Sequence, residues 1–203
     1  MTISVKKRNG DTASLDLERV HHIVEHACRG LAGVSESAVE MNSGLQFFDG
    51  IETKDIQEIL IRSANDLITL ENPNYQFVAA RLLLFGLRKS VYKGHPDIHP
   101  TLKDHVKKCI DLGVYDKHIL DRFTEDEWEI LNSYMDHERD MLFTYAGMRQ
   151  VTDKYLVQDR STGEIFETPQ FMYIMIAATL FQNDDKFYRL DYIKKYYDAI
   201  SKH

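Results

Sequence analysis

Basic side chains in the N-terminal half of the sequence have the positions of a polyphosphate-binding site. Lys7 and Arg8 directly precede an Asn-Gly pair, which favours a tight hairpin turn, so a short strand would hold both cations at its end. Thr53 is expected to be the N-cap of a predicted helix, whose first backbone N–H groups lack intrahelical partners and attract anions. Arg88 and Lys89 close another predicted helix. Together these groups would bind a triphosphate; the alternative is a basic edge exposed to solvent.

A second chemical pattern is the metal signature HxxEH, which His22, Glu25 and His26 match literally. In the inverted zinc-protease motif, two histidines one helical turn apart bind the metal beside a carboxylate base. These three residues lie opposite the apolar stripe of a predicted helix, whereas a catalytic zinc needs a third ligand and a dry, shaped cavity. A solvated polar face is therefore the favoured interpretation, and we expect no metal in this chain.

The charged cluster from His137 to Asp140 also admits two interpretations. Dense charges of both signs can form an acid/base site, but they more often form a structural network of ion pairs. We favour the structural network. The sequence contains no GxxxxGK[ST] loop, no GxGxxG after a strand, no GxSxG elbow and no CxxC pair, so no familiar catalytic site is assembled.

Composition limits the possible classes of protein. The 203 residues contain 43% hydrophobic residues and only four prolines, which favours a globular and mainly α-helical fold. The net charge is −7, with acidic residues spread along the chain, so we expect no nucleic-acid partner. No segment approaches the roughly 20 apolar residues of a membrane span, and no signal peptide is recognisable, so we expect a cytoplasmic protein without membrane contact.

The two cysteines, Cys28 and Cys109, are far apart and do not form a CxxC pair. This pattern fits a reducing compartment and argues against a disulfide scaffold. Free cysteines are often buried like small apolar residues. We therefore expect two buried thiols and no nucleophile.

Apolar residues at helical spacing predict most of the secondary structure. A hairpin is expected from the Lys7 strand and a second strand at 11–15, and a smaller hairpin from 156–158 and 164–166. Thr124 begins a capping box, and Thr168 precedes a proline that starts a very apolar helix. Helices are predicted at 17–31, 35–45 (weaker), 53–70, 72–89, 102–112, from 124 through 131, 145–155, 171–181 and 190–200.

One loop, which contains Gly94, Pro96 and Pro100, is the only candidate domain boundary. It predicts an N-terminal domain, 1–93, built from a small β-hairpin and about four helices. The second domain, 94–203, is expected to be helical with one short β-hairpin.

Three stretches together resemble the large subunit of class I ribonucleotide reductase, and the likeness extends over the whole chain. They are VKKRNG at 5–10, YQFVAARL at 75–82, and the block at 136–173 that includes DHERDM, KYLV and ETPQFMY. The resemblance implies that the first domain is an ATP-cone, an allosteric nucleotide-binding domain. It implies that the second is the helical N-terminal domain, which in this family precedes a ten-stranded α/β barrel.

In this family the barrel carries the radical-bearing cysteine, the reducing cysteine pair and a second allosteric site. We expect this chain to stop where the barrel begins, and neither Cys28 nor Cys109 matches a catalytic cysteine of the family. The resemblance therefore implies a regulatory part of ribonucleoside-diphosphate reductase, without catalytic residues of its own. The alternative is a stand-alone or split-gene nucleotide-sensing assembly module without turnover.

The resemblance also implies an overall-activity site that takes ATP or dATP as effector. Lys7 and Arg8 would contact the phosphates, and Arg19 would supply a further cation. The segment expected around the nucleotide is Ala13, Ser14, Leu15, Asp16, Leu17, Glu18 and Arg19. Thr53, Asp55, Gln57 and Lys89 would complete the pocket.

Two positions depart from the pattern of a bacterial relative, which typically has Glu in place of Ala13 and His in place of Gln57. Loss of these polar contacts would weaken the discrimination between ATP and dATP. In the family, ATP favours the active complex with the small radical-generating subunit, and dATP favours an inactive assembly. The expected partners are that subunit, the barrel domain and a second copy of the complete large subunit, in deoxyribonucleotide synthesis for DNA replication.

Overall fold

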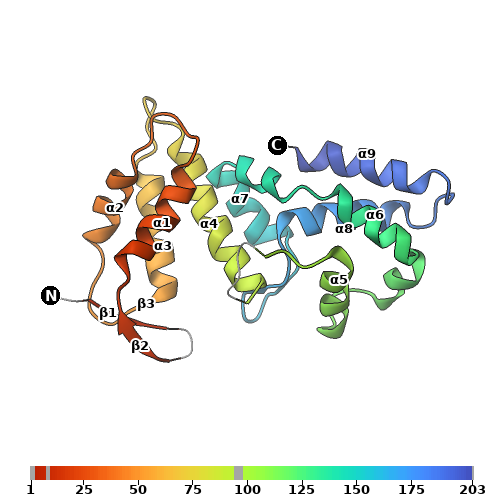
Figure 1. Cartoon of the computed structure of the whole chain (residues 1–203), viewed down its shortest axis with the longest axis horizontal. Helices are drawn as coiled ribbons and strands as arrows, with labels where there is room; N and C mark the ends of the chain where they lie inside the picture. The colour runs from red at the N-terminus through yellow and green to blue at the C-terminus, as the bar shows by residue number, and fades with distance from the viewer. Residues whose placement is uncertain (1–2, 8–9, 94–97, 203) are drawn as a thin grey trace. The chain divides into compact units, whose positions relative to one another are not determined.

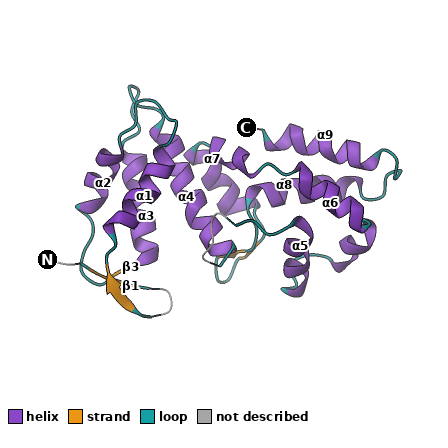
Figure 2. Cartoon of the chain, in the orientation of Figure 1, coloured by secondary structure: helices purple, strands orange, loops and turns teal. Residues whose placement is uncertain are grey.

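The computed structural model describes residues 3–7, 10–93 and 98–202, which are mostly helical (Figure 2). The chain forms two compact units. The first contains Met1–Gly86 and Phe143–Arg149, and the second contains Leu87–Leu142 and Gln150–His203. The mainly α-helical fold class is confirmed. The domain boundary at the 94–100 loop stays a prediction, and 94–97 lie outside the described residues.

A three-stranded sheet in the order β2-β1-β3 lies at one end of the first unit (Figure 1). Strand β1 (Ser4–Lys6) pairs antiparallel with β2 (Thr12–Ser14), as the hairpin prediction required, and Gly10 has the positive φ of 88° that its turn needs. Strand β3 (Ile51–Glu52) pairs parallel with β1 and was not predicted. Two residues are too few to show an alternating pattern in the sequence.

The helices of the first unit start where the sequence predicts, apart from the last. Helix α3 begins at Thr53, but Glu52 occupies the N-cap position that the sequence analysis gave to Thr53. Asn72 and Pro73 lie in a turn, so α4 begins only at Tyr75. The helices are α1 (Leu17–Cys28), α2 (Glu36–Gly44), α3 (Thr53–Asp66) and α4 (Tyr75–Val91), of which α4 belongs to this unit as far as Gly86.

Side chains of the YQFVAARL stretch hold this unit together. Arg81 Nη1 donates hydrogen bonds to the carbonyls of Ala27 and Arg29 at 3.1 and 2.8 Å, at the C-terminal end of α1. These carbonyls have no partner within their own helix, so the guanidinium supplies one. The Tyr75 hydroxyl accepts the N–H of Ser35 at 2.9 Å, where α2 begins.

The second unit is built around the apolar helix α8 (Pro169–Phe181), against which α9 (Arg189–Ser201) packs. Its core contains the buried rings of Trp128, Phe171 and Tyr197. The Thr124 capping box is confirmed at the start of α6. The described elements of this unit are α5 (Leu102–Asp111), η1 (Lys117–Arg122), α6 (Glu125–Tyr134), η2 (His137–Leu142), the π-helix η3 (Val151–Tyr155), β4 (Gln158–Asp159), β5 (Glu164–Ile165), α8 (Pro169–Phe181) and α9 (Arg189–Ser201). Helix α7 (Tyr145–Gln150) belongs to the first unit as far as Arg149.

Through the ranges that the structure describes, no helix has both the length and the apolar character needed to traverse a bilayer.

Candidate functional site

The end of strand β1 and the start of helix α3 lie side by side. In the parallel pair, Lys6 is in register with Glu52, and neighbouring strands are about 4.8 Å apart. Lys7 directly follows β1 and Thr53 directly follows β3, so the register places Lys7 beside the first turn of α3. The backbone N–H of Lys7 donates to the Asp11 carbonyl at 2.8 Å, which keeps Lys7 within the hairpin.

The N-terminus of α3 has an uncapped first turn. Glu52, at the N-cap position, makes no side-chain hydrogen bond to the N–H groups of that turn. Its carboxylate lies 3.1 Å from Lys54 Nζ instead, and this hydrogen bond raises the pKa of Lys54. The free backbone N–H groups, the helix dipole and Lys7 therefore favour an anion here.

The segment expected around the nucleotide links β2 to α1. Ala13 lies opposite Val5, whereas Ser14 lies opposite Ser4, toward the other end of β1 from Lys7. Asp16 then caps α1 by accepting the N–H of Arg19 at 3.0 Å. Helices α1 and α3 thus both begin next to the sheet (Figure 1). The exposed residues of this segment are Ser14, Asp16, Leu17, Glu18 and Arg19.

The remaining predicted residues lie on α3 and α4. Asp55 is in the first turn of α3 and is half-buried. Gln57 is also half-buried, and its Nε2 donates a 2.7 Å hydrogen bond to the Leu82 carbonyl of α4. Lys89 lies in the last turn of α4, in the second unit, so its place at the site stays a prediction. Arg8 lies outside the described residues.

Arg88 was wrongly counted among the cations of an open site. Its side chain is buried in the second unit, where Nη2 donates to the His137 carbonyl at 2.6 Å and lies 3.5 Å from the Asp140 carboxylate. A signal for this was present in the sequence, because Arg88 follows Leu84 by four residues and thus lies on the same apolar face of α4.

The cluster at His137 to Asp140 is the structural network that the sequence favoured. Arg139 pairs with Asp198 at 2.8 Å, and Asp140 accepts a 2.8 Å hydrogen bond from Gln170. Burial raises the pKa of Asp140 to about 7, although the nearby Arg88 opposes the shift. The carboxylate has protein partners and is fully buried, so it is not available to a substrate.

The HxxEH residues form part of an exposed polar face on α1. His22 Nδ1 lies 3.5 Å from the Glu25 carboxylate, and His26 is also exposed. Outside the gaps at 1–2, 8–9, 94–97 and 203, no three His, Cys, Asp or Glu side chains are grouped to hold a metal ion.

Both cysteine thiols are buried, as expected. Burial raises the pKa of Cys28 to about 11 and that of Cys109 to about 12. The thiolate is the nucleophilic form, so neither side chain is activated near neutral pH.

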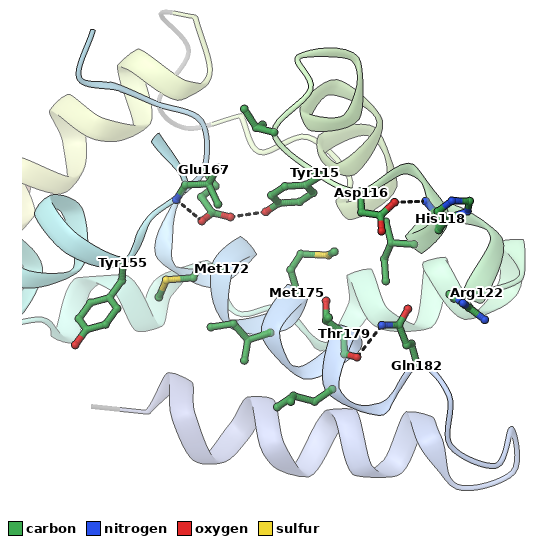
Figure 3. A pocket seen from close by; sticks show the side chains of 15 residues that line it. Tyr115, Asp116, His118, Arg122, Tyr155, Glu167, Met172, Met175, Thr179 and Gln182 are labelled. Carbon is green, nitrogen blue, oxygen red and sulfur yellow. Dashed lines mark hydrogen bonds between the residues drawn. The ribbon is translucent and has the colours of Figure 1, made fainter. Parts of the chain in front are cut away.

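A cavity of about 660 Å³ lies in the second unit (Figure 3). Its wall includes Met172 and Met175 of α8, and the Glu167 and Tyr115 side chains point toward each other beside it. The Glu167 carboxylate accepts hydrogen bonds from the Tyr115 hydroxyl and from the Val157 N–H. Both carboxylate oxygens of Glu167 have protein partners, so Glu167 is not a free acid or base. The wall is mainly apolar, and its other ionisable side chains include Asp116, His118 and Arg122.

Comparison with known families separates the two parts of the chain. Residues 3–90 match the family described as the ATP cone domain. Residues 141–203 match the family described as ribonucleotide reductase, all-alpha domain. The first match contains the β1–α3 junction, and an ATP cone is a nucleotide-sensing regulatory domain. The second contains α8 and α9.

Similar proteins of known name include alpha subunits of ribonucleoside-diphosphate reductase. The chain is 47% identical over 197 residues to ribonucleoside-diphosphate reductase 1 subunit alpha of Escherichia coli, covering 97% of the chain and 26% of that protein. It is 38% identical over 201 residues to the alpha subunit of Enterobacteria phage T4, covering 98% of the chain and 26% of that protein. For the alpha subunit of Helicobacter pylori the identity is 35% over 202 residues, covering 98% of the chain and 24% of the relative.

The chain thus spans about a quarter of the length of these relatives. The likeness covers nearly all of its residues and both of its units, and the two family matches follow each other in the order that the sequence predicts. The chain therefore carries an ATP cone domain followed by a ribonucleotide reductase all-alpha domain, and it is similar over nearly all of its length to about a quarter of the length of ribonucleoside-diphosphate reductase alpha subunits.

Proposed function

We propose that the first unit binds ATP or dATP at the β1–α3 junction and reports the effector to a complete ribonucleoside-diphosphate reductase large subunit. One observation carries this proposal: within the ATP cone match, the register of β1 and β3 places Lys7 beside the uncapped N-terminus of α3. A cation beside unpaired N–H groups is the arrangement that holds a polyphosphate.

The proposed site assigns a part of the nucleotide to each element. Lys7, Arg8 and the first turn of α3 at Thr53 hold the phosphates. Asp55, three residues beyond the N-cap, adds a negative charge near them, which favours the helix dipole but repels a polyphosphate. Residues 13–19 border the nucleoside, with Arg19 and Lys89 as further cations. Gln57 contributes from the second turn of α3.

The complete protein is proposed to reduce ribonucleoside diphosphates to deoxyribonucleotides in the cytoplasm. Its barrel domain would supply the catalytic cysteines, a small subunit would supply the radical, and two large subunits would form a dimer. The effector is ATP or dATP, and we propose no metal in this chain. By itself the chain is expected to bind nucleotide and to reduce no substrate.

Calorimetry on the 203-residue chain tests this proposal. Titration with ATP and with dATP should each show saturable binding, whereas GTP at the same concentrations should bind far less. The same preparation, supplied with ribonucleoside diphosphate and a dithiol reductant, should form no deoxyribonucleotide. Absence of ATP and dATP binding would refute the effector site, and turnover by the pure chain would refute the assignment of catalysis to another domain.

A further inference from the structure

Gln57 makes a directional contact between two helices of the first unit. Its Nε2 donates to the Leu82 carbonyl of α4 at 2.7 Å. In a regular helix that carbonyl also accepts the N–H four residues ahead, which belongs to Gly86. The oxygen has two lone pairs, so it can accept both donors. This hydrogen bond joins the N-terminal half of α3 to a fixed point on α4.

Gly86 leaves the space that this contact needs. A Cβ added to Gly86 would lie 3.1 Å from Gln57 Cγ and 3.5 Å from its Cδ. The distance to Cγ is shorter than the roughly 3.5–4.0 Å that carbon atoms prefer, whereas the distance to Cδ is an ordinary contact. Glycine is unfavourable within a helix, because it adds backbone freedom to the unfolded chain and buries no side chain. At Gly86 the missing methyl group allows the stem of Gln57 to lie against α4.

We infer that Gln57 is a positioning residue of the effector site, acting on the phosphates through the orientation of α3, with Gly86 as its matching position on α4. The inference rests on the proposed function and deepens it. Ile56 and Leu60 bury α3 in the core through apolar contacts, which are less directional than a hydrogen bond. The Gln57 hydrogen bond adds a directional constraint on the rotation of α3, and the N–H groups at its N-terminus bind an acceptor best when they are well aligned with it.

The chemistry of the contact predicts which ligands depend on it. Since one amide N–H of Gln57 is committed to Leu82, the side chain acts on α3 and its phosphate-binding N–H groups. Loss of this side chain should therefore weaken the binding of every ligand that carries the polyphosphate, whether or not a nucleoside is attached. If Gln57 instead contacted the nucleoside directly, its loss would weaken the binding of the nucleotide alone.

The test measures binding of ATP and of inorganic tripolyphosphate to the 203-residue chain, well below its unfolding temperature. Gln57→Met keeps an unbranched side chain of similar length but removes the donor. We expect both ligands to bind roughly 3- to 10-fold more weakly, the range for one directional hydrogen bond. Gln46→Met is the control, because Gln46 donates to the Ser63 hydroxyl at 3.3 Å, near the other end of α3. It should leave both affinities unchanged.

A double-mutant cycle tests the matching of the two positions. Gly86→Ala should weaken the binding of both ligands by a similar factor, because its methyl group displaces Gln57. In a Gln57→Ala background that methyl group has room, and Gly86→Ala should then change affinity less than about twofold. Gly44→Ala is the control, since a Cβ on this α2 glycine would meet no atom within 4 Å.

The outcomes separate the inference from the function on which it rests. If the unmodified chain binds ATP and the Gln57→Met variant binds ATP and tripolyphosphate as tightly as the unmodified chain does, the positioning role is wrong and the effector site stands. Selective loss of ATP binding would also overturn it, in favour of a nucleoside contact. If the unmodified chain binds neither ligand, both proposals fail.

Discussion

Lys7 follows Lys6, the last residue of β1. Val5 is buried, and side chains alternate along an extended chain, so we expect Lys7 on the same side as Val5 and Lys6 on the other. We expect Lys7→Ala to weaken ATP binding about tenfold, because a charge-assisted contact to a phosphate is lost. Lys6→Ala removes the same charge and should have a much smaller effect. Equal losses in the two variants, measured by calorimetry, would mean that only the general charge of the hairpin matters.

His105 is a buried base whose ring stacks on Phe171 at a centroid distance of 4.0 Å. Burial, with a smaller contribution from Lys108, lowers the pKa of His105 to about 3. The unfolded chain takes up a proton near pH 6.5 and the folded chain does not, so stability is lost as the pH falls from 6.5 toward 3. His105→Phe keeps the stacking and should reduce this slope by up to about 1.4 kcal/mol per pH unit.

Asp140 changes the stability with pH in the direction opposite to His105 over much of the same pH range, and it serves as a comparison. Its pKa is raised to about 7, so between pH 3.8 and 7 the folded state holds a proton that the unfolded state has released. Its contribution to stability therefore falls as the pH rises. Asp140→Asn should make the loss of stability on acidification steeper, whereas His105→Phe makes it shallower. Urea unfolding between pH 4 and 7 measures both, and slopes that change in the same direction would contradict this assignment.

At the level of elements, helix α3 carries opposing electrostatic effects in its first turn. Asp55 stabilises the helix dipole but repels a bound polyphosphate. We expect Asp55→Asn to tighten ATP binding severalfold while lowering the thermal stability slightly. Asp66→Asn, at the other end of the same helix, is the matched control and should leave the affinity unchanged. Weaker ATP binding in Asp55→Asn would show that this carboxylate assists the ligand.

Elements with local sequence signals were predicted well. The capping box at Thr124 and the Thr168-Pro169 pair mark the starts of α6 and α8, since both signals depend only on neighbouring residues. Strand β3 was missed, because its two residues form a strand only by pairing with β1, far away in sequence. The cap of α3 was misplaced by one residue, because Thr53 has the capping residue type but Glu52 holds the extended backbone.

The candidate site was predicted in part, and the failures share one physical cause, namely contacts between residues far apart in the sequence. Lys7 and Thr53 lie close together because of a strand register that cannot be read from the sequence. Arg88 shares its residue type with Lys89 but is buried, since burial depends on the helix face and on a carboxylate 52 residues away. The role of Gly86 had no visible signal either, because a glycine within a helix is informative only when the atom facing it is known.

For the molecule as a whole, the effector should stabilise one unit selectively. A ligand that binds only the folded state stabilises it by about 2.7 kcal/mol at a hundred times its dissociation constant. We expect saturating ATP to slow amide hydrogen exchange in β1, in β3 and in the first turn of α3. Exchange in α8 and α9 should not change. Protection confined to α8 and α9 would place the nucleotide in the second unit and contradict the proposed site.

The parallel pairing of β1 with β3 also has a consequence for the time course of folding. The Asp49 carboxylate accepts both the N–H and the hydroxyl of Ser4, 45 residues away, at 2.8 and 2.6 Å. Helices form from near neighbours in the chain, whereas this closure must first overcome the entropy of the loop between the two strands. Refolding chains should therefore regain helical circular dichroism before they gain the ability to capture a fluorescent ATP analogue, a delay that stopped-flow mixing can time.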